Sequence, residues 1–375
     1  MQVIASGALL SPAMAMQSRA QGLGTDYDVV IVGAGVAGLA AAERLLSADD
    51  ELKVLVLEAR DRSGGRVYSV DRDDMYRDAE LGAQHLEHPD GAAWDVLDKF
   101  GLESETLSDG SLTLFPGLSA LVDALSDATA GKVQLNSEVT DIFWREGLVG
   151  VNYLNRGLNS AVTARRMIIA LPAGVLRNNP PSITPPLGAL KVNALNELGR
   201  KRYVTASLLF SAESASLKDG GESWIGSDGD TQLRAFRTGS QGELLLEAQF
   251  GGAKAELLER ESDELVLSLA VRAFKDVLNA TPLTADARWA EVANWQRDPF
   301  SSGGGTVAAS TSTHLTLAES MGGTIFFAGE ATADPGMVDT IHGAYASGAR
   351  AAREVAVTLS LEMEEAEAEP LFELL

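Results

Sequence analysis

The stretch that decides the fold is residues 26 to 59, DYDVVIVGAGVAGLAAAERLLSADDELKVLVLEA. Its order predicts a buried apolar strand at residues 29–32, a glycine turn, an Ala/Leu-rich helix and a second apolar strand at residues 54–57. Strand, turn, helix and strand in this order form a βαβ unit with two parallel strands. We therefore predict an α/β fold with a Rossmann-like parallel sheet.

The glycine turn has the GxGxxG spacing of a dinucleotide site. Gly33 would permit the tight turn, Gly35 the close approach of a pyrophosphate, and Gly38 the packing of helix against strand. The first helical residues, Val36 and Ala37, would offer unpaired N–H groups to the phosphates. A glycine-rich turn in a fold without a cofactor is the alternative.

The residues after the second strand favour FAD over a nicotinamide dinucleotide. Glu58 lies 25 positions after Gly33, where an acid can accept hydrogen bonds from a ribose diol. Residues 59–67, ARDRSGGRV, add a second glycine pair with flanking arginines, which brings donors and positive charge to the same pyrophosphate. A nicotinamide domain usually continues into another βα unit instead. The candidate contacts in this segment are Ala59, Arg60, Gly65 and Arg66.

A segment near the C-terminus, TIFFAGEATADPGMVDTIHGAYASGARAAREV at 324–355, predicts a strand at residues 325–327 and a helix of small residues that starts near Thr340. A helix N-terminus carries about half a positive charge, which would stabilise the negative charge of reduced flavin near N1 and C2=O. Small residues such as Ala344 would permit the close approach of the ring.

Together these motifs resemble the flavin-containing amine oxidase superfamily, which includes monoamine oxidases, polyamine oxidases and the more distant renalases. Three further segments carry the resemblance, which covers most of residues 26–357: ELGAQHLEH (80–88), VQLNSEVTDIFW (133–144) and RRMIIALPAGVL (165–176). The resemblance implies that FAD binds with its ribose at Glu58 and its phosphates near Arg66. The other contacts it implies are Gly82, Ala83 and Gln84 beside the flavin ring, the backbone of Val139 at the adenine, Gly329 and Glu330 at the ribitol chain, and the backbone of Thr340 and Ile341 at the pyrimidine edge.

The FAD-binding domain is predicted to be discontinuous, and a second α+β substrate domain is predicted on a mixed or antiparallel sheet. The FAD domain comprises 26–88, 117–176 and 320–358, the substrate domain 89–116 and 177–319, with a leader or extension at 1–25 and an acidic tail at 359–375. In the substrate domain, strands are expected at 203–210, 233–237, 244–250 and 289–295, and helices near 189–199 and 254–278. The substrate should lie where the two domains join.

Amine oxidation by this chemistry transfers a hydride from the carbon next to an uncharged nitrogen to flavin N5. Many family members place a lysine on a strand of the substrate sheet, in contact with N5 through a water. Matching residues 198–210 to that strand puts Thr205 at the lysine position. Lys201 would lie four residues away on the same strand face, and we expect it to be a surface charge.

Three further residues are candidates by resemblance. His85 stands where the family often has an aromatic residue, Glu87 where an acid or histidine contacts the substrate amine, and Trp295 near the flavin. A satisfied core histidine, a solvated turn glutamate and a core aromatic remain the alternatives. His85 and His88 would face opposite ways on a strand, so no metal pair is predicted. Only about 29 residues separate Glu87 from Gly117, which makes this chain as compact as renalases and predicts a shallow pocket.

Composition excludes several function classes. The 375 residues include 53 acidic and 30 basic side chains, and a net charge of −23 disfavours nucleic acid as a partner. The absence of cysteine excludes disulfides, a thiolate nucleophile and a thioether-linked flavin, so FAD should be non-covalent. No segment predicts an integral membrane helix. Residues 3–15 resemble a signal-peptide core but lack a preceding base, so a cytoplasmic location is expected, with export as the alternative.

The sequence therefore predicts an FAD-dependent oxidoreductase that oxidises an amine, with O2 or another acceptor reoxidising the flavin. The partner is a small-molecule substrate, for which a cationic amine is one candidate. Renalase-like oxidation of a dihydropyridine or another non-amine donor is an alternative. A non-catalytic FAD-binding accessory protein is another. The oligomeric state is left open.

Overall fold

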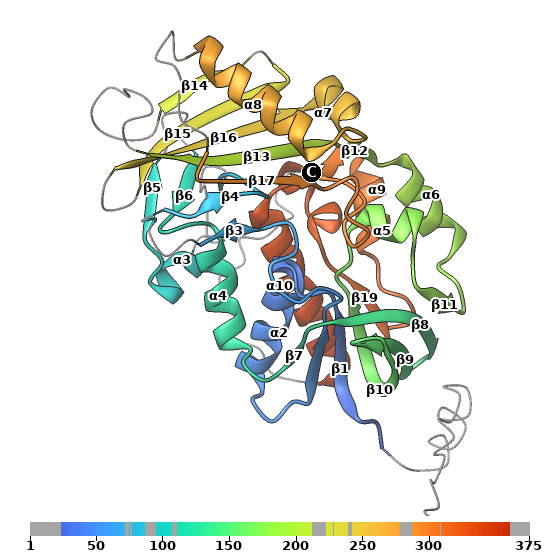
Figure 1. Cartoon of the computed structure of the whole chain (residues 1–375). Coiled ribbons are helices and arrows are strands. Elements are labelled where there is room, and N and C mark those ends of the chain that lie inside the picture. Colours follow the sequence, from blue (N-terminus) through green and yellow to red (C-terminus); the bar gives the residue numbers. More distant parts are fainter. Residues whose placement is uncertain are drawn as a thin grey trace, which may run out of the picture.

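The computed structural model describes residues 24–71, 75, 77–86, 95–106, 111–211, 223–227, 229–238, 242–277, 287–307 and 309–360. Two sheets dominate this part of the chain (Figure 1). The first carries the glycine turn, and the second lies above it in the figure, beneath two helices. Within the described ranges, no helix is long and apolar enough to cross a membrane.

The first sheet has the strand order β11-β8-β9-β10-β1-β2-β7 among the described residues, and β19 also pairs with β10. Its strands are β1 (Tyr27–Val32), β2 (Val54–Leu57), β7 (Val133–Gln134), β8 (Ser137–Arg145), β9 (Leu148–Asn155), β10 (Leu158–Ile169), β11 (Ser182–Thr184) and β19 (Ile325–Phe327). β7, β2, β1, β10 and β19 are parallel, whereas β8, β9 and β10 form an antiparallel meander. The predicted strands at 29–32, 54–57 and 325–327 are confirmed. Such continuous apolar runs suit strands that are buried on both faces.

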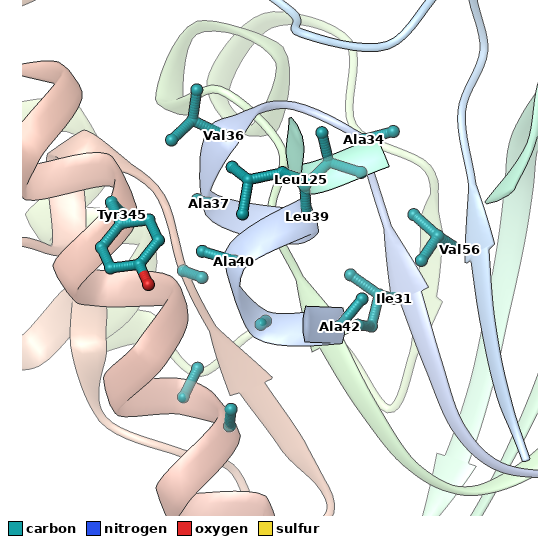
Figure 2. Packing of buried hydrophobic residues seen from close by; sticks show 14 of the residues in the cluster. Ile31, Ala34, Val36, Ala37, Leu39, Ala40, Ala42, Val56, Leu125 and Tyr345 are labelled. Carbon is teal, nitrogen blue, oxygen red and sulfur yellow. The ribbon is translucent and has the colours of Figure 1, made fainter. Parts of the chain in front are cut away.

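Two helices distant in sequence pack on one face of this sheet: α2 (Val36–Ala48) and α10 (Ile341–Leu359). Gly348 lets them approach closely, because a Cβ there would lie only 2.1 Å from the Ala37 carbonyl oxygen. Figure 2 shows Tyr345 on α10 facing the helix that carries Ala37 and Ala40. α4 (Ser119–Ala128) adds Leu125 to the same core. The fold thus joins the two ends of the predicted FAD domain in one core.

The second sheet is antiparallel, with the order β14-β15-β16-β13-β17 among the described residues. Its strands are β14 (Ser223–Ser227), β15 (Thr231–Thr238), β16 (Glu243–Gly251), β13 (Tyr203–Phe210) and β17 (Trp289–Asn294). These strands confirm the four runs expected from the sequence. α7 (Gly252–Leu258) and α8 (Asp263–Val277) cover one face of the sheet with apolar side chains.

The helical run expected near 254–278 is helical in the structure, but it is divided into two helices. The polar residues 259–262, ERES, separate α7 from α8. The Ser262 hydroxyl accepts a hydrogen bond from the Leu265 N–H at 3.3 Å, as a capping residue at the start of a helix does.

Shorter elements connect the two sheets. They are β3 (Ser69–Val70), β4 (Ala79–Glu80), α3 (Asp95–Phe100), β5 (Ser104–Thr106), β6 (Leu112–Leu114), α5 (Ala173–Asn178), α6 (Ala189–Glu197), β12 (Gly199–Lys201), β18 (Gly305–Val307), α9 (Thr311–Ala318), η3 (Glu330–Thr332) and η4 (Pro335–Met337). One of them overturns an expectation. Lys201 and Thr205 do not share a strand, because Lys201 ends β12, which pairs with β18, whereas Thr205 lies on β13.

Candidate active site

A cavity of about 530 Å³ lies at the carboxyl ends of β1 and β2 and extends to the second sheet. Val32 and Leu57, the last residues of those strands, line one end, and Tyr203 and Gln249 line the other. In open α/β sheets this edge is where ligands bind. The cavity therefore joins a nucleotide-type site to a surface supplied by the second sheet.

The glycine turn forms a cradle at the start of α2. Gly33 has a φ of 103°, and a Cβ there would lie 2.9 Å from the Ala170 carbonyl oxygen. A Cβ at Gly38 would lie 1.9 Å from the Gly33 carbonyl oxygen, so only glycine fits. Gly35 precedes the helix and lines the cavity. Its backbone and the first N–H groups of α2 are thus open to an anionic group.

Glu58 is buried and already oriented. Its Oε2 accepts a hydrogen bond from the Ala34 N–H at 2.8 Å, and its Oε1 accepts one from the Arg60 N–H at 2.9 Å. Each carboxylate oxygen has a further lone pair, and Glu58 lines the cavity. The geometry therefore fits a ribose diol that donates to this carboxylate.

Arg66 and Glu330 connect the segment after β2 to the segment after β19. Arg66 Nη2 donates to Glu330 Oε1 at 3.0 Å, and Thr306 Oγ1 donates to the same oxygen at 2.8 Å. Glu330 Oε2 accepts from the Asp339 N–H at 3.1 Å. The carboxylate is thereby held at the cavity wall beside a cation that suits phosphate.

The N-terminus of α10 opens onto the same cavity. Thr340 caps the helix, and its hydroxyl accepts from the Gly343 N–H at 2.7 Å. Thr340, Ile341 and Ala344 line the cavity wall. A ring edge that develops negative charge would therefore meet the positive end of the helix dipole.

Beside this helix start, Lys201 forms an ion pair that the sequence did not predict. Its Nζ donates to Asp339 Oδ2 at 2.5 Å, and Lys201 lines the cavity. Burial alone would lower the pKa of Lys201, but the hydrogen bond and charge of Asp339 raise it overall. Burial also raises the pKa of Asp339. Lys201 keeps 41% of its side chain exposed, as a surface charge does, but β12 also brings it into an ion pair with Asp339, the residue before the N-cap of α10.

The cavity lining includes polar and aromatic side chains. His85 and Trp295 are among them, and Trp295 Nε1 donates to the Leu81 carbonyl oxygen at 3.1 Å. Gln84 is 4% exposed, and neither atom of its side-chain amide has a hydrogen-bond partner among the described residues. A buried amide without partners costs about 1 to 3 kcal/mol, so this group suits a bound molecule.

The cavity lining contains every predicted cofactor residue except Gly38, which packs behind the turn. Val139, Gly82, Ala83 and Gly329 are among those at the wall. Of the predicted catalytic residues, Glu87 lies outside the described residues. His88, for which no metal pair with His85 was predicted, lies outside them too. Thr205 is fully buried and does not line the cavity; it stands opposite Gln249, which does.

Sequence reasoning missed several lining residues. Tyr203 and Gln249 could have been found, since alternation along their strands places them opposite the apolar face that packs on α7 and α8. No sequence pattern indicated that Lys191 would line the cavity. Its Nζ donates to the carbonyl oxygens of Thr316, Leu317 and Glu319 at the end of α9, and burial lowers its pKa to about 8.

The sequence model of a protein family described as flavin containing amine oxidoreductase matches residues 36–115 and 105–356. This chain belongs to the flavin-containing amine oxidoreductase family. FAD is the cofactor of the family, and the cradle, the buried Glu58 and the start of α10 fit it.

Sequence relatives of this chain match over very different lengths. Amine oxidase [flavin-containing] A of Equus caballus is 40% identical over 91 residues, which cover 24% of this chain and 17% of the relative. Lysine-specific histone demethylase 1 homolog 2 of Arabidopsis thaliana is 25% identical over 445 residues, covering 88% of this chain and 59% of the relative. The chain thus spans less than two thirds of the length of either relative.

Several solved structures share the fold of this chain. Cyclohexylamine oxidase from Brevibacterium oxydans superposes with a TM-score of 0.73 at 15% identity, covering 89% of this chain and 100% of that one. Wild-type putrescine oxidase bound to putrescine superposes with a TM-score of 0.68 at 18% identity, covering 88% and 99%. At these identities, the likeness shows a common architecture.

Proposed function

We propose that this protein is an FAD-dependent enzyme that oxidises a small amine. The observation that carries the proposal is one cavity that joins the glycine cradle, the start of α10 and the aromatic and polar wall of the second sheet. Cyclohexylamine oxidase and putrescine oxidase, which share this architecture, act on small amines by name. Family membership supplies the cofactor.

The chain's own residues would bind and orient the cofactor. Glu58 would accept the ribose hydroxyls, and the N–H groups of α2 together with Arg66 would hold the phosphates. The start of α10, at Thr340 and Ile341, would face the pyrimidine edge. When bound, FAD supplies the two-electron acceptor for the hydride that leaves the carbon next to nitrogen.

The part of the cavity lined by the second sheet, His85 and Trp295 would orient the substrate and exclude water. Tyr203, Gln249, His85 and Trp295 surround this space, and the hydrogen bond of Trp295 to Leu81 holds its indole in one orientation. A neutral amine that gave up a hydride would become a protonated imine, which water would hydrolyse after release. An electron acceptor, oxygen or another, would be needed to complete the turnover. These lining residues are therefore suited to positioning the substrate and excluding water.

Two catalytic assignments remain proposals from the sequence. Glu87 follows the described His85 by two positions, and a carboxylate there would attract a protonated amine. The second is Thr205, which lies beside Gln249 on the same face of the second sheet and has a buried hydroxyl without a hydrogen-bond partner among the described residues. A water or a ligand group that reached this hydroxyl would satisfy it.

A reduction screen tests the proposal. The FAD-loaded protein is mixed without oxygen with cyclohexylamine, putrescine, an amino acid or a dihydronicotinamide, and the visible flavin band is followed. Bleaching by an amine is expected. Bleaching by the dihydronicotinamide alone would assign a non-amine donor, and full FAD occupancy without bleaching by any donor would leave a binding role.

Two glycine variants provide matched controls for this screen. Gly38→Ala places a methyl group 1.9 Å from the Gly33 carbonyl oxygen, so this variant should lack both the flavin band and the reaction. Gly336→Ala adds a methyl group where nothing lies within 4 Å, and it should behave as the parent protein does.

A further inference from the structure

The face of the second sheet that points away from α7 and α8 carries two polar rows. Directly paired residues on antiparallel strands point to the same face, and those two positions further along the strands do so as well. The charged row consists of Arg234, Glu247 and Ser207, and the amide row of Gln232, Gln249 and Thr205. The Ser207 hydroxyl donates to the Glu80 carbonyl oxygen at 3.3 Å, so this face of the sheet contacts the segment that begins at Glu80.

Two residues of the charged row form hydrogen bonds with the two ends of the segment 80–84. Arg234 Nη1 donates to the Gln84 carbonyl oxygen at 2.7 Å. Glu247 Oε1 accepts from the Glu80 N–H at 2.6 Å. Arg234 and Glu247 are themselves 3.6 Å apart, and each is 1% exposed. A buried ion pair thus clamps residues 80–84, the segment that ends in the cavity wall.

The charge of this clamp is balanced by the state of Glu80. Its side chain accepts from the Leu118 N–H at 2.7 Å and from the Ser69 hydroxyl at 2.8 Å. Burial and the neighbouring Glu247 raise the pKa of Glu80 to about 8, so Glu80 is protonated at neutral pH. Arg234 then faces one carboxylate charge, that of Glu247, in the buried cluster.

The clamp holds the backbone of Gln84 but leaves its side chain without a protein partner. Its carbonyl oxygen is bound by Arg234, whereas both amide atoms are unpaired among the described residues and the residue lines the cavity. An amide both donates and accepts. The flavin ring edge, which offers an N–H donor and carbonyl acceptors, matches both properties.

We propose that Arg234 is a positioning residue that, together with Glu247, fixes Gln84 so that its side-chain amide forms a donor and acceptor contact with the bound flavin. The inference deepens the proposed function and rests on FAD binding in this cavity. Arg234 does not line the cavity, so it acts only through Gln84. Residues of the second sheet would thereby set the geometry of a cofactor contact made by Gln84, which lies outside that sheet.

A double-mutant cycle tests this route. Gln84→Leu, Arg234→Met and the double variant are prepared as apo-proteins, and the FAD dissociation constant and the visible circular dichroism of bound FAD are measured. Each single change should weaken FAD binding about tenfold, and the double variant should be no weaker than Gln84→Leu alone. Arg234→Lys, which keeps the charge, should recover part of the loss.

Two results would overturn the proposal. One is an unchanged dissociation constant and dichroism in Gln84→Leu. The other is a double variant whose loss is the product of the two single losses, because a general loss of stability would act independently of Gln84. Arg237→Met is the matched control, since Arg237 is exposed on the same strand and donates to the Gly242 carbonyl oxygen. It should bind FAD as the parent does.

A second variant of the ion pair can replace Arg234→Met in the cycle if Arg234→Met folds poorly. Glu247→Gln keeps an acceptor for the Glu80 N–H but removes the charge that faces Arg234, and it should show the same non-additivity with Gln84→Leu. None of these measurements uses an amine. A protein that binds FAD but oxidises no amine would therefore end the proposed function and leave this inference standing.

Discussion

Exchanging Glu58 for glutamine should weaken FAD binding about 5- to 150-fold, equivalent to about 1 to 3 kcal/mol. The carboxylate accepts from the Ala34 N–H at 2.8 Å and from the Arg60 N–H at 2.9 Å, and its other lone pairs face the cavity. An amide nitrogen cannot accept, so glutamine leaves one of these N–H groups unpaired. It also removes the charge that would bind the ribose hydroxyls.

The assay is titration of the apo-protein with FAD, followed by the quenching of flavin fluorescence. Thermal unfolding of the apo-protein is measured in parallel, because the two backbone hydrogen bonds also stabilise the turn without FAD. Glu51→Gln is the matched control, since it makes the same chemical change at an exposed position between α2 and β2. If Glu58→Gln binds FAD within about twofold of the parent, a difference of about 0.4 kcal/mol, the ribose contact is wrong.

Three further predictions concern the core, the buried acid and the ion pair at α10. Gly348→Ala, whose methyl group would lie 2.1 Å from the Ala37 carbonyl oxygen, should lower the free energy of unfolding by about 1 to 3 kcal/mol in urea titrations. Burial and the neighbouring Glu247 raise the pKa of Glu80 from 4.5 to about 8, so the folded state binds an extra proton between these pH values and the free energy of unfolding falls as the pH rises through this range. Glu80→Gln should flatten this pH dependence. An unchanged slope of the unfolding free energy against pH would contradict the assignment. Lys201→Met leaves Asp339 without its counter-charge beside the start of α10, and it should lower the flavin midpoint potential by about 20 to 60 mV in spectroelectrochemical titration, the equivalent of about 1 to 3 kcal/mol. A potential at or above that of the parent would refute this reading.

Local signals account for the parts of the site that were predictable. The turn at Gly33, Gly35 and Gly38 and the acid at Glu58 follow from spacing within one βαβ unit, where turn geometry and strand length leave little choice. The capped start of α10 at Thr340 is likewise a short-range pattern. Such features depend on residues a few positions apart, so they can be recognised before any tertiary contact is known.

The wrong expectation for the strand of Lys201 depended on long-range pairing. Lys201 was assigned to the strand of Thr205 because periodicity alone cannot show that β12 breaks away to pair with β18. Its ion pair with Asp339 joins residues 138 positions apart. Neither partner has a local pattern that indicates the other.

The sequence by itself determined the βαβ unit, the dinucleotide cradle and the flavin-type helix near the C-terminus, since each is set by backbone geometry over a short span. Only the tertiary structure decided which side chains of the second sheet meet that cradle. The clamp on Glu80 and Gln84 comes from partners 167 and 150 positions away, and it exists because the sheet order brings Arg234 and Glu247 to one face. Contacts of that kind follow from how whole elements pack, and no local sequence pattern records them.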